Sequence, residues 1–205
     1  VGDSISCGYG NEGTSPDCRF SAETENHYLS YGAILARRFG AELSTVAWSG
    51  RGVVKNYNGQ AGDVMPVLYD RALPETSTST WQPSEPYHAV IVNLGTNDFS
   101  TEPDPEMGQF VVGYVTLLAT IRAHHPKAFV LCTIGPMLGP ADRERAEAGI
   151  AAAVAERNSA GDRRIEMFRM RTQNDKPGCD WHPGLTTHQR IAAELAVPLR
   201  HALDW

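Results

Sequence analysis

The sequence has little of what nucleic-acid-binding, membrane and repeat proteins require. Its 18 lysine and arginine residues are spread thinly and are outnumbered by 24 acidic residues, for a net charge of −6. Without a basic stripe, nucleic acid is not an expected partner. No apolar run approaches the roughly 20 residues that span a bilayer, so a membrane is not expected either. Internal repeats and low-complexity tails are also missing. The 205 residues, 41% of them hydrophobic, suit one globular domain with a sizeable core.

Cysteine is scarce too, with four residues at positions 7, 18, 132 and 179. Cys132 ends an apolar run that starts at Phe129, where a buried free thiol is expected. Cys7 and Cys18 bracket a loop rich in glycine, asparagine, serine and proline, and could close it as a disulfide. Cys179 could instead pair with either of them. A disulfide would suit an exported protein.

Alternating strand and helix patterns predict a parallel α/β sheet. The expected strands cover residues 43–48, 89–94, 128–134 and 164–168. The expected helices cover residues 28–39, 110–126 and 141–157, and a last helix opens with a capping box at residues 186–189. Gly40 is a natural stop for the first helix, and Pro198 should bend or shorten the last one.

Four short motifs carry reactive groups where such a sheet binds ligands, just beyond the carboxyl ends of its strands. They are Gly2-Asp3-Ser4-Ile5, Ser49-Gly50-Arg51-Gly52, Gly95-Thr96-Asn97-Asp98 and Asp180-Trp181-His182-Pro183. In this order they supply a hydroxyl, a flexible backbone turn, a side-chain amide and an imidazole. A serine hydroxyl becomes a good nucleophile when a base takes its proton. Backbone N–H and asparagine amide groups can bind the resulting oxyanion. The set predicts a serine esterase that requires no cofactor and no metal.

At these residues the chain resembles the SGNH (GDSL-type) hydrolases, essentially from end to end. Longer stretches are similar to carbohydrate esterase family two, the acetyl xylan esterase-like group. These stretches are Gly2 to Asn11, Trp48 to Gly52, Asn93 to Phe99 and Asp180 to Pro183. The resemblance implies a flavodoxin-like three-layer α/β/α sandwich with a parallel sheet. It also implies a secreted or periplasmic bacterial enzyme that removes O-acetyl groups from xylan or glucomannan through an acetyl-serine intermediate.

The resemblance also bears on domain organisation. Members of this group usually carry a β-sandwich domain before the hydrolase domain. Because Ser4 follows so soon after Val1, the strand that should deliver it is expected to be missing. Residues 1–205 are therefore expected to form a single hydrolase domain, with a β-sandwich domain upstream in the same polypeptide.

Carried over by position, the resemblance makes Ser4 the nucleophile and His182 the general base. The oxyanion hole would be the backbone N–H groups of Ser4 and Gly50 together with the side-chain amide of Asn97.

The partner of His182 stays open at this point. Asp180 precedes His182 by two positions, whereas most of the superfamily has one residue more between its acid and its histidine. Either the Asp180 carboxylate, as the third catalytic group, or a backbone carbonyl is expected to orient His182. Trp181 lies between the two residues and is expected to contact the substrate as a wall of an acetyl-sized pocket.

Several residues in and near these motifs allow interpretations other than a part in the esterase chemistry. Asp98 is expected to cap a turn rather than to act as the catalytic acid. His124 and His125 are expected at the surface, at the end of a helix. A zinc site matches no common ligand spacing, so no metal is expected; its members would be Cys179, Asp180, His182 and His188. Substrate hydroxyls could be contacted by Arg51, Lys55 and Asn56.

Two further functions remain open. A lipid or aryl esterase, or a thioesterase, would use the same chemistry but would need an apolar acyl groove, whereas the loops here are polar and aromatic. A carbohydrate-binding module on a hydrolase scaffold would bind saccharides even without Ser4.

Overall fold

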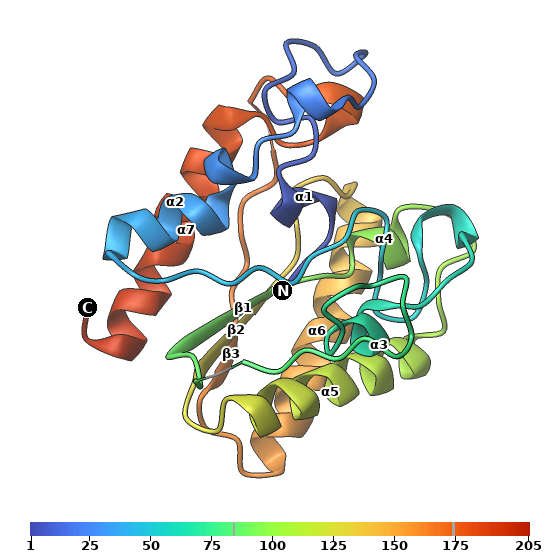
Figure 1. Ribbon diagram of the computed structural model, residues 1–205. Coiled ribbons are helices and arrows are strands. Elements are labelled where there is room, and N and C mark those ends of the chain that lie inside the picture. Colours follow the sequence, from blue (N-terminus) through green and yellow to red (C-terminus); the bar gives the residue numbers. More distant parts are fainter. Residues whose placement is uncertain (84, 174) are drawn as a thin grey trace.

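A parallel sheet lies between two layers of helices in the computed structural model, which describes residues 1–83, 85–173 and 175–205 (Figure 1). The strands are β1 (Ala89–Asn93), β2 (Phe129–Thr133) and β3 (Ile165–Met167), in the order β1-β2-β3. The α-helices are α1 (Ser4–Cys7), α2 (Tyr31–Phe39), α3 (Met65–Leu68), α4 (Thr96–Phe99), α5 (Met107–His124), α6 (Pro140–Ser159) and α7 (Leu185–Leu203). The 3-10 turns are η1 (Ala22–Thr24), η2 (His27–Leu29), η3 (Tyr57–Gly59) and η4 (Cys179–Trp181).

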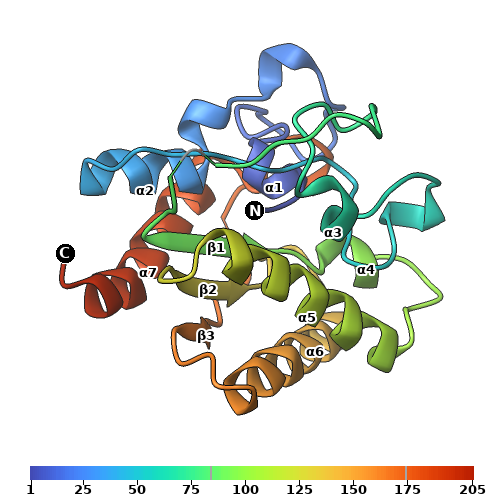
Figure 2. The same cartoon turned by 60° about the horizontal axis from the view of Figure 1, so that its bottom comes forward.

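Each face of the sheet is covered by its own pair of long helices. Side chains along a strand point to opposite faces in turn. Val92 and Cys132 therefore pack with α5 and α6, while Ile91 and Leu131 pack with α2 and α7. Figure 2 shows the two pairs of helices on opposite sides of the strands. This arrangement confirms the predicted parallel α/β sandwich, with its strands at 89–94, 128–134 and 164–168.

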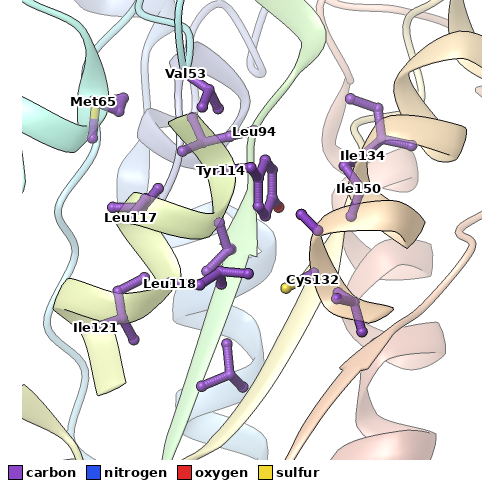
Figure 3. Packing of buried hydrophobic residues seen from close by; sticks show 14 of the residues in the cluster. Val53, Met65, Leu94, Tyr114, Leu117, Leu118, Ile121, Cys132, Ile134 and Ile150 are labelled. Atoms are coloured by element: carbon purple, nitrogen blue, oxygen red, sulfur yellow. The ribbon is translucent and has the colours of Figure 1, made fainter. Parts of the chain in front are cut away.

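The larger part of the core lies on the α5 and α6 side (Figure 3). Leu117, Leu118 and Ile121 of α5 belong to the same buried cluster as Ile150 of α6, and all are essentially inaccessible to water. Cys132 lies among them as a free, buried thiol, as its apolar sequence context predicts. This core fixes the strand ends that carry the polar motifs.

The prediction of a strand at residues 43–48 is wrong. Within this segment only Ala47 pairs, through a single parallel bridge to Gly2, and Leu43 is 46% exposed. A strand needs a partner along its length. Gly2 bridges Ala47 on one side and Asn93 of β1 on the other. In the described part of the chain, only Val1 and Gly2 therefore lie between this segment and β1. Those two residues take the position of the first strand that was expected to be missing, and they deliver Ser4 to the end of β1.

Two helix starts also differ from prediction. α2 begins at Tyr31, because Asn26 caps the separate turn η2 by accepting the N–H of Leu29. The prediction of a capping box at residues 186–189 is wrong. The helix α7 starts after Gly184, and the buried Thr187 hydroxyl donates to Asp175 instead.

Two helix ends can be compared in the same way. α2 ends at Gly40 as predicted, in the left-handed conformation. Pro198 does not shorten α7, which continues to Leu203. Among the helices of the described residues, none combines the length and the apolar character needed to cross a bilayer.

Candidate active site

Ser4 and His182 are in contact although nearly the whole chain separates them. Ser4 is the first residue of α1, whose start is capped by the Asp3 carboxyl accepting the N–H of Ile5 at 3.0 Å. The Oγ of Ser4 lies 2.9 Å from Nε2 of His182. The structure thus brings the expected nucleophile and the expected base within hydrogen-bond distance.

The imidazole of His182 is oriented by a backbone carbonyl. Its Nδ1 lies 3.1 Å from the carbonyl oxygen of Asp180. A carbonyl oxygen only accepts, so Nδ1 carries the proton and Nε2 presents its lone pair to the hydroxyl of Ser4. Burial lowers the pKa of His182 below its ordinary value, against the opposing effect of Asp180. The imidazole is therefore neutral at neutral pH, which is the state a general base requires.

The carboxylate of Asp180 points away from this contact and makes no hydrogen bond to His182 among the described residues. Its Oδ2 accepts the hydroxyl of Tyr9 and the backbone N–H of Phe20, both at 2.9 Å. Its Oδ1 accepts from the exposed Arg19 at 3.3 Å. Burial opposes ionisation, but these three donors together hold the pKa of Asp180 below its ordinary value. Of the two orienting groups that the sequence left open, the carbonyl makes the contact.

The expected oxyanion donors lie beside Ser4. Within the described structure, the backbone N–H groups of Ser4 and Gly50 have no hydrogen-bond acceptor. Gly50 has a φ of +78°, which residues with a Cβ rarely adopt. The Nδ2 of Asn97 donates to the carbonyl of Arg51 at 2.9 Å and to the Asp3 carboxyl at 3.3 Å. These bonds tie the Asn97 amide both to the Gly50 loop and to the turn of Ser4.

Two buried carboxyls support this arrangement. Burial, with a smaller contribution from the charge of Asp98, raises the pKa of Asp3 to about 7. The Asp98 carboxylate accepts the backbone N–H groups of Val53 at 2.9 Å, Val54 at 2.8 Å and Lys55 at 3.0 Å. It therefore holds the loop after Gly50, which agrees with the expectation that Asp98 is not the catalytic acid. Its role in supporting the loop was missed, because no local pattern reveals a cap formed across 43–45 residues.

The loop after Gly50 packs against this carboxylate with no space to spare. A Cβ at Gly52 would lie 2.0 Å from the carbonyl oxygen of Lys55 and 2.6 Å from Oδ2 of Asp98, so only glycine fits there.

Lys55 and Asn56, which were considered as contacts for substrate hydroxyls, make hydrogen bonds within the protein. The ammonium of Lys55 donates to the carbonyls of Thr101 and Pro103. Asn56 is 3% exposed, and its side chain bonds backbone groups of its own loop. Arg51 donates to a loop carbonyl at 3.1 Å. These polar side chains shape the loop that presents Gly50.

A disulfide links the two segments that meet at His182. Of the pairings left open, the structure forms Cys18–Cys179 and leaves Cys7 free. The sulfur of Cys179 is therefore not available to the zinc site considered above, and the described residues contain no cluster of three or more metal-binding side chains. Trp181 follows with a φ of +62° and an indole that is 61% exposed. It thus stands at the surface beside His182 rather than in an enclosed wall.

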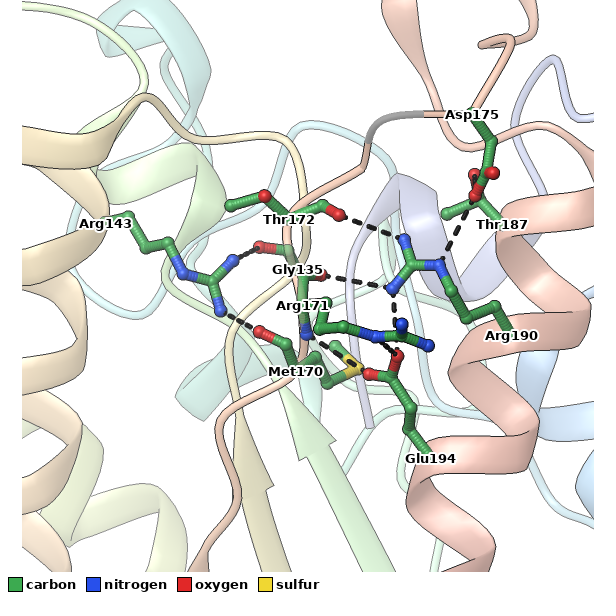
Figure 4. Close-up of polar contacts among 9 residues, drawn as sticks. All are labelled: Gly135, Arg143, Met170, Arg171, Thr172, Asp175, Thr187, Arg190 and Glu194. Carbon is green, nitrogen blue, oxygen red and sulfur yellow. Dashed lines mark hydrogen bonds and ion pairs between the residues drawn. The ribbon is translucent and has the colours of Figure 1, made fainter.

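Polar contacts hold the segment that leads to this turn (Figure 4). Arg143 of α6 donates to the carbonyls of Gly135 and Met170. Arg190 of α7 donates to the carbonyl of Thr172 at 3.1 Å and to Asp175 at 3.3 Å. Helices from both faces of the sandwich therefore hold Met170, Thr172 and Asp175 in place.

Two other histidines lie in the interior of the protein. His125 is buried and not on the surface as expected. Its Nδ1 accepts the N–H of Tyr87, and its Nε2 lies within hydrogen-bond distance of the hydroxyl of Tyr69. His188 is fully buried in α7, with its Nδ1 accepting the N–H of Tyr31. Neither is placed to replace His182.

The sequence also matches a known protein family. The GDSL-like Lipase/Acylhydrolase family matches residues 1–190, and the chain belongs to it. Its fold is the SGNH hydrolase fold, as the resemblance implied.

Within this family the chain is similar to family two carbohydrate esterases. A family two carbohydrate esterase from Clostridium thermocellum, solved in complex with cellohexaose, aligns with a TM-score of 0.96 and 36% identity, over 100% of this chain and 63% of the other. The cellulase/esterase CelE of Acetivibrio thermocellus is 36% identical over 100% of this chain and 25% of its own length. An acetylxylan esterase / glucomannan deacetylase of Cellvibrio japonicus is 26% identical over 100% of this chain and 56% of its own. The chain thus spans less than two thirds of these relatives.

Proposed function

We propose that this chain is a serine esterase that removes O-acetyl groups from polysaccharide sugars. The observation that carries the proposal is the 2.9 Å contact between Oγ of Ser4 and Nε2 of His182, beside two backbone N–H groups with no acceptor among the described residues. A nucleophile, a neutral base and preorganised donors are the parts that acyl transfer needs.

The reaction proceeds in two steps. In the first, Oγ of Ser4 attacks the acetyl carbonyl carbon while Nε2 of His182 takes its proton. The oxyanion binds the N–H groups of Ser4 and Gly50, and the Asn97 amide joins them by exchanging one of its present bonds. The intermediate then expels the sugar hydroxyl, which leaves with the proton from His182.

In the second step, water replaces the sugar hydroxyl. It gives a proton to His182 and attacks the acetyl-serine. Collapse of the second tetrahedral intermediate releases acetate and returns the proton to Ser4.

The sugar ester as substrate is supported by the activities for which the relatives are named and by the polar surroundings of Ser4. Aromatic rings lie near the reacting atoms. The half-buried Tyr9 ring lies 4.1 Å from the His182 ring and stacks on the exposed Phe20 ring at 4.4 Å, both between centroids, and the exposed Trp181 directly precedes His182. Trp181 as a substrate contact is part of this proposal.

The test compares kcat/KM for nitrophenyl acetate, butyrate and octanoate, and then measures acetate release from acetylated xylan and glucomannan. One methylene in a tight pocket changes selectivity by roughly 1–3 kcal/mol, so acetate should be preferred over butyrate by about tenfold or more. A preference for long chains, or no acetate from either polysaccharide, would favour a lipid esterase or thioesterase.

Saccharide binding is a second candidate function, favoured by the relative that was solved with cellohexaose. It predicts that Ser4→Ala retains saccharide affinity while losing hydrolysis. Calorimetric titration of that variant with cellohexaose and xylohexaose separates binding from catalysis.

The proposal extends to the polypeptide and its location. We place the protein outside the cytoplasm, because a disulfide such as Cys18–Cys179 persists in oxidising compartments. Thiol titration of the unfolded chain should give two free thiols before reduction and four after it. We also propose that the same polypeptide carries a β-sandwich domain, as the family resemblance implies.

A further inference from the structure

The backbone just before His182 has an unusual conformation. Asp180 has φ +48° and ψ +39°, and Trp181 has φ +62°. Two consecutive residues with a Cβ in the left-handed region cost free energy, although aspartate and asparagine visit it more readily than most. Such a conformation persists only where surrounding contacts enforce it, and it often serves a function.

The conformation determines where one carbonyl points. In it, the oxygen of Asp180 lies 3.1 Å from Nδ1 of His182 and thereby sets both the tautomer and the ring orientation. A turn of the peptide unit after residue 180 would move this oxygen away and leave the proton of Nδ1 without an acceptor.

The side chain of the same residue is fixed from the opposite side. Its Oδ2 receives the hydroxyl of Tyr9 and the N–H of Phe20, each at 2.9 Å. Both donors belong to the N-terminal loop, which the Cys18–Cys179 disulfide joins to this turn. In Figure 1 this loop, in blue at the top, lies against the red segment that leads into α7.

We propose that the carboxylate of Asp180 is a positioning group that acts through its own backbone. Held by Tyr9, it keeps residue 180 left-handed, so that its carbonyl accepts from His182. It does not act on the imidazole directly. This inference rests on the proposed function, since it assigns a role within the Ser4–His182 site.

A series at position 180 tests the proposal, measured as kcat and KM on nitrophenyl acetate. Asp180→Asn keeps the tolerance for the left-handed region and an oxygen that can accept from Tyr9, so kcat should fall by no more than about fivefold. Asp180→Ala loses both and should lose about 10–100-fold in kcat. Asp180→Gly loses the carboxylate but adopts this φ without strain, so it should lie between the two. KM should change little throughout the series.

The hydroxyl of Tyr9 gives an independent test. Tyr9→Phe keeps the ring on His182 and removes only the donor, and it should lower kcat by about threefold to tenfold. In the Asp180→Ala background the same change should have no further effect, because the acceptor is already gone. Asp17→Asn, which changes one exposed charge on the same loop, is the matched control.

Three results would overturn the inference. A loss of about 10⁴ in Asp180→Asn, as in serine proteases whose catalytic aspartate contacts the histidine, would show a direct role. Equal activities of the alanine and glycine variants would show that backbone conformation is not involved. Additive effects of Tyr9→Phe and Asp180→Ala would show that the two residues act separately.

Circular dichroism checks that each variant is folded. If Asp180→Ala does not fold, the asparagine and glycine variants and Tyr9→Phe decide the outcome. The rate at which a fluorophosphonate labels Ser4 is measured on the same proteins. Because labelling needs Ser4 and His182 but no sugar, it tests the inference even if the wild-type protein deacetylates no polysaccharide, a result that would contradict only the proposed function.

Discussion

Replacing Asp98 with alanine should destabilise the protein through the loop that presents Gly50. The carboxylate accepts the N–H groups of Val53, Val54 and Lys55, and it is fully buried. A buried N–H without an acceptor costs about 1–3 kcal/mol. Val53 is buried, whereas Val54 and Lys55 are half-buried and can recover water in part.

A second effect acts in the opposite direction. Burial raises the pKa of Asp98, so removing the carboxylate also relieves a desolvation cost. The net loss in the free energy of unfolding should therefore be about 2–4 kcal/mol.

Urea unfolding followed by tryptophan fluorescence measures this loss, with the exposed Asp17→Ala as control. Below the unfolding transition, kcat on nitrophenyl acetate should also fall, because the Gly50 N–H is no longer held in place. Asp98→Asn should be milder, since its amide oxygen can still accept from part of the loop. A loss below about 0.5 kcal/mol for Asp98→Ala, the range of ordinary surface substitutions, would refute the idea that this carboxylate holds the loop.

Two further predictions concern the chemistry. Asn97→Ala should lower kcat by roughly 10²–10³ with little change in KM, because an oxyanion donor acts on the transition state; a change confined to KM would make Asn97 a substrate or structural residue. The acid limb of the pH profile of kcat/KM should be centred below pH 6.5, because burial lowers the pKa of His182 below that ordinary value and the neutral imidazole is the base. Activity should then fall as the pH drops through the lowered pKa, and an acid limb centred well above 6.5 would contradict the burial argument.

The parts of the fold that local patterns determine could be predicted from the sequence. Residues 89–94 and 128–134 are nearly all apolar, as strands covered on both faces must be. Residues 43–48 were also expected to form a strand, but among the described residues only Gly2 pairs with Ala47, so no regular strand forms. Strand formation depends on a partner that a local pattern does not reveal.

The candidate site shows the same limit. The contact of Ser4 with His182 could be predicted because the polar motifs lie where such a sheet binds ligands, and the family resemblance that they carry pairs this hydroxyl with this imidazole. The carbonyl that orients His182 could not be predicted, since it depends on the left-handed backbone at Asp180. The contacts of Lys55 with Thr101 and Pro103, and those of Asn56 within its own loop, likewise depend on the loop conformation that Asp98 holds.

The most direct test of the central claim is mass spectrometry of the protein after reaction with a serine-directed fluorophosphonate. We expect a single adduct, mapped to Ser4. We also expect that kcat for acetate release from acetylated polysaccharide falls by on the order of 10⁶ in a folded Ser4→Ala variant. An adduct on another residue, or a Ser4→Ala variant that keeps more than about a hundredth of the activity, would contradict the assignment of Ser4 as the nucleophile.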